Sequence, residues 1–160
     1  MNYYSLNNIA PTTTFENAVI KGLAPDRGLY FPESITPLDA SFFENIETLS
    51  NEAIAFEAIQ QFISPEIPET VLRTIVSETL NFDFPVVSLT KSISTLELFH
   101  GPTMAFKDVG ARFMARCLGY FNKDNSNEVT VLVATSGDTG GAVANGFLGV
   151  KGVRVVILYP

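Results

Sequence analysis

Residues 129–158 read VTVLVATSGDTGGAVANGFLGVKGVRVVIL, and this stretch decides the fold. Val129 to Ala134 is a continuous run rich in β-branched residues, which is typical of a buried parallel strand. The Gly-rich loop TSGDTGG at 135–141 and a helix of small residues lead to a second apolar run at Val153 to Leu158. A strand, a helix and a further strand in this order form a βαβ unit. The stretch therefore predicts an α/β fold with a parallel sheet.

The loop at 135–141 follows a predicted strand, and open α/β sheets bind ligands at the carboxyl ends of their strands. Its backbone N–H groups and the start of the next helix favour an anion, either a phosphate or a carboxylate. The loop lacks the lysine of a P-loop and departs from GxGxxG, so nucleotide binding is the weaker interpretation. A turn that serves only helix-strand packing is the alternative, although Ser136, Asp138 and Thr139 are many polar groups for packing alone.

A second stretch, LELFHGPTMAFKDVGARF at 96–113, places Lys107 at the start of a predicted helix. Leu96 to Phe99 fits a short strand that the following Gly-Pro pair ends. Thr103 is the expected N-cap, and the apolar spacing after it predicts a buried helix to about Gly119.

Lys107 is the candidate nucleophile of this stretch. A cation near a helix N-terminus is disfavoured by the helix dipole, and apolar neighbours disfavour the charged form too, so both effects would lower the pKa of the lysine. A lysine of this kind is suited to Schiff-base chemistry. An ordinary surface lysine is the alternative for any single lysine taken alone.

Three motifs closely resemble the threonine synthase family, which uses pyridoxal 5'-phosphate and has the tryptophan synthase β-like fold. They are GLAPDRGLYFPE at 22–33, HGPTMAFKDVGARF at 100–113 and ATSGDTGGAVA at 134–144. The resemblance extends across essentially the whole chain, since Tyr3 to Ser5 and Phe15 to Val19 are similar to the opening strand and first helix of that family.

The resemblance implies two domains. Residues 1–80 would form the family's mainly helical N-terminal domain, and residues 81–160 would begin a cofactor-binding three-layer αβα domain of fold type II. Because family members are more than twice as long, we expect the chain to be an N-terminal fragment that is inactive alone. The family's later Gly-rich cup for the cofactor phosphate would then be missing, and the strand edge at 153–158 would be an association surface.

The resemblance also implies a reaction and roles for single residues. O-phosphohomoserine and water would become threonine and phosphate, the last step of threonine biosynthesis, with pyridoxal phosphate as the electron sink. Lys107 resembles the lysine that binds this cofactor and then serves as acid and base. Asp138 resembles the residue near the ring oxygen of the cofactor. The loop that would receive the substrate carboxylate consists of Ser136, Gly137, Asp138, Thr139 and Gly140.

Two alternatives stay open beside this function. One is a related enzyme of the same fold that acts on another phosphorylated or hydroxylated amino acid. The other is a noncatalytic homologue that binds a phosphate or an amino acid, which would be expected to lose the lysine. Lys107 stands intact inside its whole motif, and this favours an enzyme.

Length and composition agree with a cytoplasmic globular protein, and the resemblance implies that it acts on a small molecule, O-phosphohomoserine. The 160 residues are 46% hydrophobic, which is ample for a core. The formal net charge of −7 argues against nonspecific nucleic-acid binding. No apolar run approaches transmembrane length, and the first residues lack the pattern of a signal peptide. Cys117 is the single cysteine, expected to be buried, and we expect no metal site.

The first 80 residues carry further signals for local structure. Thr13 and Glu16 fit a capping box that opens a helix to about Lys21, where Gly22 ends it. A short strand is expected at 29–31, and amphipathic helices are expected at 51–63 and 68–80.

Two residues leave a choice between a structural and a functional role. In Asp26-Arg27-Gly28 we prefer a turn with a left-handed glycine at Gly28 over an arginine that reaches the substrate phosphate. His100 is either a contact to cofactor or substrate or a packed side chain.

Overall fold

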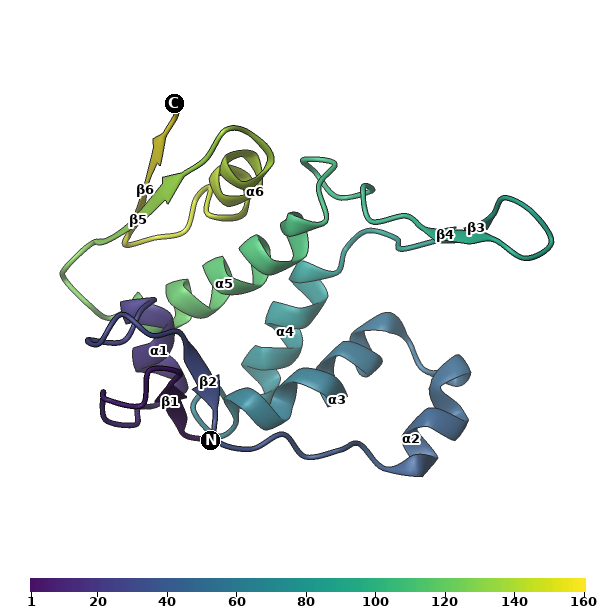
Figure 1. Cartoon of the computed structure of the whole chain (residues 1–160), viewed down its shortest axis with the longest axis horizontal. Coiled ribbons are helices and arrows are strands. Elements are labelled where there is room, and N and C mark those ends of the chain that lie inside the picture. The colour runs from purple at the N-terminus through teal and green to yellow at the C-terminus, as the bar shows by residue number, and fades with distance from the viewer. The chain divides into compact units, whose positions relative to one another are not determined.

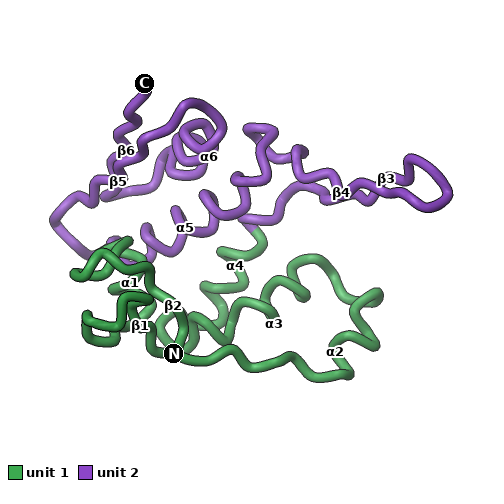
Figure 2. The backbone as a smooth tube through the Cα atoms, viewed as in Figure 1, with its two compact units in different colours: residues 1–77 green, residues 78–160 purple.

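A computed structural model describes residues 1–160, which form two compact units. Unit 1 is Met1–Ser77 and unit 2 is Glu78–Pro160 (Figure 2). The division falls close to residue 80, where the sequence predicts a domain boundary. That boundary refers to the domains of the longer family members, and it stays a prediction.

Unit 1 opens with a small antiparallel sheet. Strand β1 (Tyr3–Ser5) pairs with β2 (Tyr30–Pro32), with Tyr3 opposite Pro32. The expected opening strand is thus confirmed, and the strand expected at 29–31 lies one residue further along the chain. The Tyr3 hydroxyl donates to the Phe62 carbonyl at 2.6 Å, and burial raises its pKa to about 12.

Helix α1 (Phe15–Lys21) ends as predicted at Gly22, whose φ is 71°. Its start differs, because Thr14 rather than Thr13 is the N-cap and accepts from the Asn17 amide at 3.2 Å. In a capping box, the Glu16 side chain would also accept a backbone amide at the start of the helix. Here the Glu66 carboxylate takes this role and accepts the amides of Phe15 and Glu16 at 2.9 and 2.8 Å. A carboxylate 50 residues away in sequence therefore satisfies amides that a capping box leaves to a local side chain.

Three helices and a 3₁₀ turn complete unit 1 (Figure 1). Helix α3 (Asn51–Ile63) and helix α4 (Glu69–Thr79) confirm the two amphipathic helices, and the last two residues of α4 fall in unit 2. The short helix α2 (Ala40–Asn45) and the 3₁₀ turn (Ile46–Thr48) were not predicted. The core of these helices contains Phe56, Ile63, Ile67, Leu72, Ile75 and Val76.

The turn at 26–28 forms, but its left-handed residue is Arg27, with φ 66°, and the prediction for Gly28 was wrong. Gly28 is required for another reason, since a Cβ there would lie 2.0 Å from the Ser5 Oγ. The turn is held by the Asp26 carboxylate, which accepts from the Ser5 hydroxyl at 2.6 Å and from three backbone amides between 2.9 and 3.1 Å. Arg27 thus belongs to a tightly bonded turn.

Unit 2 contains the predicted βαβ unit. Strand β5 (Val129–Ala134), helix α6 (Asp138–Gly146) and strand β6 (Val153–Leu158) follow one another, and the strands pair in parallel with Val129 opposite Val153. Helix α5 (Lys107–Asn122) packs against α6 and also contacts the sheet. The α/β class and the parallel pair are confirmed.

Two details predicted for the βαβ unit were wrong, namely the burial of β5 and the bounds of its helix. Strand β5 alternates between partly buried and exposed residues and is not buried on both faces, because its partly buried side chains, Val131 and Val133, face α5 and α6 while the alternate ones are exposed. Helix α6 begins at Asp138 and ends at Gly146, so it includes half of the expected loop.

The segment before α5 also departs from prediction. An antiparallel hairpin of β3 (Val86–Ser88) and β4 (Ser94–Leu96) was missed, and the strand expected at 96–99 ends at Leu96. The Glu97 amide still donates to the Pro85 carbonyl at 2.9 Å, but proline has no amide to return the bond, so the ladder stops.

The start and the end of α5 were predicted a few residues early. The left-handed φ of Met104, 55°, separates Thr103 from the helix, so Thr103 is not its N-cap. The helix runs to Asn122, because its carboxamide donates to the carbonyls of Asn127 and Gly152 at 3.2 and 2.8 Å and thereby orders the next turn.

The Asp26 turn gives a prediction for pH dependence. The Ser5 hydroxyl and the three amides lower the pKa of Asp26 from 3.8 to about 2. Because the pKa of Asp26 is lower in the folded state than in the unfolded state, its ionised form stabilises the fold at any pH above the unfolded-state pKa. This stabilisation is lost as the pH falls from about 4 toward 2. We expect Asp26→Asn to lower the midpoint of urea unfolding at pH 6, and the gap to the parent chain to narrow by pH 2.

Asp39→Asn is the matched control, since Asp39 precedes α2 without a side-chain capping bond. It removes the same charge and should leave the midpoint nearly unchanged. An Asp26→Asn chain as stable as the parent at pH 6 would contradict the assigned role of this carboxylate.

Candidate functional site

Lys107 is the first residue of α5 and is half-buried beside a hollow of about 600 Å³ in unit 2. We call this space the Lys107 hollow, and residues of helices α5 and α6 and of strand β5 line it. Its lining residues are Phe106, Lys107, Gly110, Ala111, Met114, Val131, Val133, Thr139, Ala142, Val143 and Phe147. The hollow is apolar apart from the lysine amine and the threonine hydroxyl.

The amine of Lys107 has no carboxylate partner. All the salt bridges of the chain involve other residues. The amine lies 5.6 Å from the centre of the Phe106 ring. A primary amine at an apolar hollow, without a neutralising carboxylate, is a suitable nucleophile for a carbonyl compound.

The hollow forms because α5 and α6 approach each other closely. A Cβ on Gly146 would lie 2.9 Å from the backbone carbon of Ala111, so only glycine permits this backbone contact. At the other end of α6, a Cβ on Gly140 would lie 2.6 Å from the Thr135 Cγ2. Both ends of α6 are therefore fixed against their neighbours by glycines.

The predicted anion loop is divided between two environments. Ser136, Gly137 and Asp138 are exposed, and the Gly137 amide donates to the Thr135 hydroxyl at 3.2 Å. Thr139 lines the Lys107 hollow, whereas Gly140 is a buried residue of α6 that faces Thr135 and Ile157. The structure thus brings Thr139, and no other residue of the loop, to the hollow beside Lys107.

The first turn of α6 presents backbone donors. Its N-cap is Gly137, which has no side chain to accept the first amides of the helix. Unbonded amides at a helix start, with the helix dipole behind them, suit an anion. Asp138 adds a carboxylate to the same turn, and its negative charge would repel a bound anion there.

Two other candidates lie elsewhere. The His100 Nε2 pairs with the Glu97 carboxylate at 2.7 Å, and its ring stacks on Phe99 with 4.8 Å between centroids. Arg27 belongs to unit 1 and to the Asp26 turn. These contacts favour the structural interpretation of His100 and Arg27.

The structure contains no reactive cysteine, no metal-binding cluster and no helix that could span a membrane. Burial raises the pKa of Cys117 to about 12, so its thiol stays protonated and unreactive. No three His, Cys, Asp or Glu side chains gather where they might share a metal ion. None of the helices is both long and apolar enough to span a bilayer.

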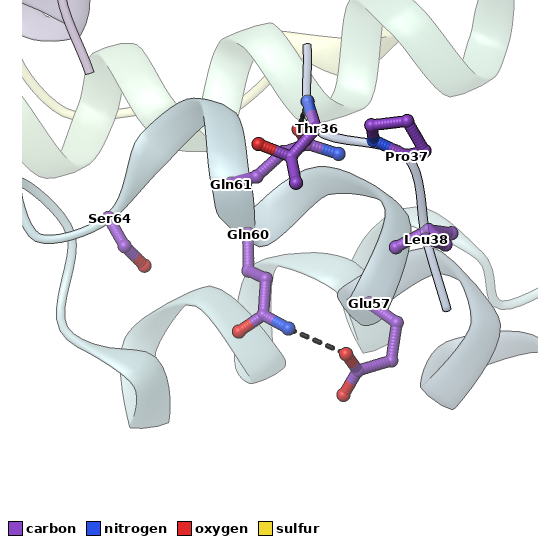
Figure 3. Close-up of a pocket in the computed structure, with 7 residues that line it drawn as sticks. All are labelled: Thr36, Pro37, Leu38, Glu57, Gln60, Gln61 and Ser64. Carbon is purple, nitrogen blue, oxygen red and sulfur yellow. Dashed lines mark hydrogen bonds between the residues drawn. The ribbon is translucent and has the colours of Figure 1, made fainter. Parts of the chain in front are cut away.

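A second hollow of about 260 Å³ lies in unit 1 between α3 and the segment 36–38 (Figure 3). Several of its polar groups already bond each other, since the side-chain Oε1 of Gln61 accepts the Thr36 amide at 2.8 Å and the Gln60 carboxamide donates to the Glu57 carboxylate at 2.7 Å. It contains none of the predicted site residues and has no nucleophile beside an acid or base.

Known proteins match the chain along its length. A family model described as the threonine synthase N terminus matches residues 2–80. The threonine synthase of Buchnera aphidicola subsp. Acyrthosiphon pisum is 45% identical over 100% of the chain and 37% of that protein. The crystal structure of PLP-bound threonine synthase from Brucella melitensis superposes with a TM-score of 0.93 at 35% identity, over 100% of the chain and 36% of that structure.

The chain matches the threonine synthase family. The structure of the Escherichia coli threonine synthase agrees, with a TM-score of 0.92 and 40% identity over 100% of the chain and 37% of that structure. The chain thus spans little more than a third of the length of the relatives it matches. The predicted fold, which is the N-terminal part of the threonine synthase fold, is confirmed.

Most residues of the Lys107 hollow were not predicted as site residues. Gly110, Ala111 and Met114 follow Lys107 by three, four and seven positions, which is the spacing of one helix face. Val131 and Val133 alternate along β5 as strand residues do. Helical spacing counted from Lys107 and from Thr139 would have found the lining residues of α5 and α6, and the alternation of strand residues would have added Val131 and Val133.

The backbone contact of α5 and α6 gives a stability prediction. We expect Gly146→Ala to destabilise the chain by about 1–3 kcal/mol, because the new methyl group meets the backbone of Ala111, which cannot move aside cheaply. Urea unfolding followed by circular dichroism measures this change.

Gly141→Ala is the matched control in the same helix. No atom lies within 4 Å of its added Cβ, so alanine should stabilise the chain by roughly 0.5–1 kcal/mol through helix propensity. Equal effects of the two substitutions would show that the close contact at Gly146 is not formed.

Proposed function

We propose that this chain supplies Lys107 and the start of α6 to the active site of a threonine synthase. The reaction would convert O-phosphohomoserine and water into threonine and phosphate, with pyridoxal 5'-phosphate, in the cytoplasm. The observation that carries the proposal is the amine of Lys107 at an apolar hollow, in a chain that matches threonine synthases from end to end. The activity is proposed for the complete protein, and we expect residues 1–160 alone to be inactive.

The residues of the Lys107 hollow fit the ring of the cofactor. Its volume of about 600 Å³ lies in the range of ligand pockets, and valines, alanines, a methionine and phenylalanines suit the faces of an aromatic ring. Lys107 is the single cation of the lining, so the cofactor phosphate needs partners beyond these residues. The fit therefore covers the ring and its carbonyl carbon.

Lys107 would have two roles in this site. Its amine would hold the cofactor, whose pyridinium ring supplies an electron sink that makes the carbon-bound protons of the substrate acidic. Once free, the same amine would move a proton at the α carbon as a base and return it as an acid.

The start of α6 would bind the substrate carboxylate. Ser136 is exposed before the helix, and the first amides of α6 lack a capping side chain, so both can donate to a carboxylate. Thr139 lies at the hollow itself and would link the carboxylate site to the cofactor site. Asp138 near the ring oxygen would need a proton or a hydrogen-bond donor to avoid repulsion.

The test uses the complete protein supplied with pyridoxal phosphate. We expect a visible absorption band and, after borohydride reduction and peptide mapping, a cofactor adduct on Lys107. Lys107→Ala should remove the adduct and lower the rate of threonine formation from O-phosphohomoserine by roughly 10²- to 10⁴-fold, which is the usual contribution of a general base.

Lys91→Ala is the control, because Lys91 is an exposed lysine in the turn of the β3–β4 hairpin. It should keep both adduct and rate. An adduct with turnover of O-phosphoserine but not O-phosphohomoserine would identify a related enzyme instead. No adduct on Lys107 in folded protein would leave the start of α6 as an anion site without this chemistry.

A further inference from the structure

The residue next to Lys107 is a buried carboxylate. The exposed fraction of Asp108 is 1%, and it is the one charged residue among the buried polar side chains, which are otherwise Ser5, Thr79 and Asn122. A carboxylate is costly to bury unless hydrogen bonds compensate it. Its partners therefore indicate what it is for.

Both oxygens of Asp108 bond the same residue of the preceding turn. The Thr103 amide donates to Oδ2 at 2.9 Å, and the Thr103 hydroxyl donates to Oδ1. The carboxylate also lies against Gly101, where a Cβ would be 2.5 Å from Oδ2. Asp108 thus holds the turn at 101–103 from its first residue to its last.

Little else holds the chain just before Lys107. The N-cap of α5 is Phe106, which makes no side-chain capping bond. Between Gly101 and the helix, the Met104 amide donates to the Gly101 carbonyl at 3.0 Å, and the Asp108 amide donates to the Ala105 carbonyl at 3.0 Å. The Asp108 carboxylate is therefore the side-chain group that joins this turn to the first turn of α5.

The charge surroundings agree with a fixed carboxylate. Arg112 lies one helical turn further along α5 and donates to the Glu78 carbonyl and the Asn81 carboxamide. Burial and the neighbouring Arg116 lower the pKa of Arg112, and the negative charges of Asp108 and Glu78 oppose this. Arg112 places a positive charge near Asp108 without forming an ion pair with it, so the bonds from Thr103 hold the carboxylate.

Neighbouring residues of a helix point about 100° apart, so Asp108 can face the preceding turn while Lys107 lines the hollow. We propose that Asp108 is a positioning residue, which holds the amine of Lys107 at the hollow by fixing the turn at 101–103 to the start of α5. This inference rests on the proposed function. It assigns Asp108 no contact with substrate or cofactor.

The experiment follows cofactor attachment in the complete protein. Pyridoxal phosphate is added back to the apoprotein, and two quantities are measured. They are the rate constant for the appearance of the visible absorption band and the fraction of Lys107 that carries the cofactor after borohydride reduction. Turnover gives kcat and KM for O-phosphohomoserine. Circular dichroism and thermal unfolding report the folded fraction of each variant.

We expect Asp108→Ala to slow attachment and lower kcat by roughly tenfold to a hundredfold, because small misplacements of a reacting group have effects of this size. Thr103→Val keeps the amide bond to Asp108 and loses the hydroxyl bond, so its loss should be smaller. Thr103→Ser restores the hydroxyl and should recover the parent rate constant. Asp124→Ala, which removes an exposed carboxylate, is the charge control.

The outcomes separate positioning from folding. If Asp108→Ala does not fold, the Thr103→Val and Thr103→Ser pair decides. A lower folded fraction with unchanged rate constants would show a merely structural role and overturn the inference, as would parent rate constants in the Asp108→Ala and Thr103→Val variants. A parent protein without an adduct on Lys107 would overturn the proposed function and this inference together, whereas an adduct unaffected by the substitutions would overturn the inference alone.

Discussion

The backbone contact of α5 and α6 at Ala111 and Gly146 is the constraint on which the site of unit 2 depends. The parallel strands place α6 on the sheet, but the distance between the helices follows from the missing side chain of Gly146. This distance sets the width of the Lys107 hollow, which residues of both helices line. The chemistry proposed for Lys107 therefore depends on a residue that has no chemistry of its own.

The helices of the chain begin in different ways. Helix α1 takes its first amides to the Glu66 carboxylate, and α3 takes one to the Ser50 hydroxyl. Helix α6 begins at a glycine and leaves its first amides unbonded by any side chain of its N-cap. Helices α2 and α5 also begin without a side-chain cap, so an open start does not by itself mark an anion site. What sets α6 apart is that its first turn brings Thr139 to the Lys107 hollow.

Periodicity and local chemistry predicted a large part of this protein. Strands β5 and β6 and helices α3 and α4 were found because β-branched runs and apolar faces act over neighbouring residues. The hairpin of β3 and β4 was missed because its strands are three residues each and lack a tight-turn signal. Caps were missed where the partner lies far away in sequence, as for Glu66 at α1.

The sequence by itself determined the α/β class, the parallel strand pair, the place of Lys107 at a helix start and the resemblance to threonine synthases. These follow from spacing along the chain and from the order of motifs. The tertiary structure alone decided that Thr139 reaches the Lys107 hollow, that Arg27 rather than Gly28 is left-handed, and that Thr103 bonds Asp108 instead of capping a helix. The reason is physical: these outcomes depend on which groups are buried against each other, and burial is a property of the packed chain.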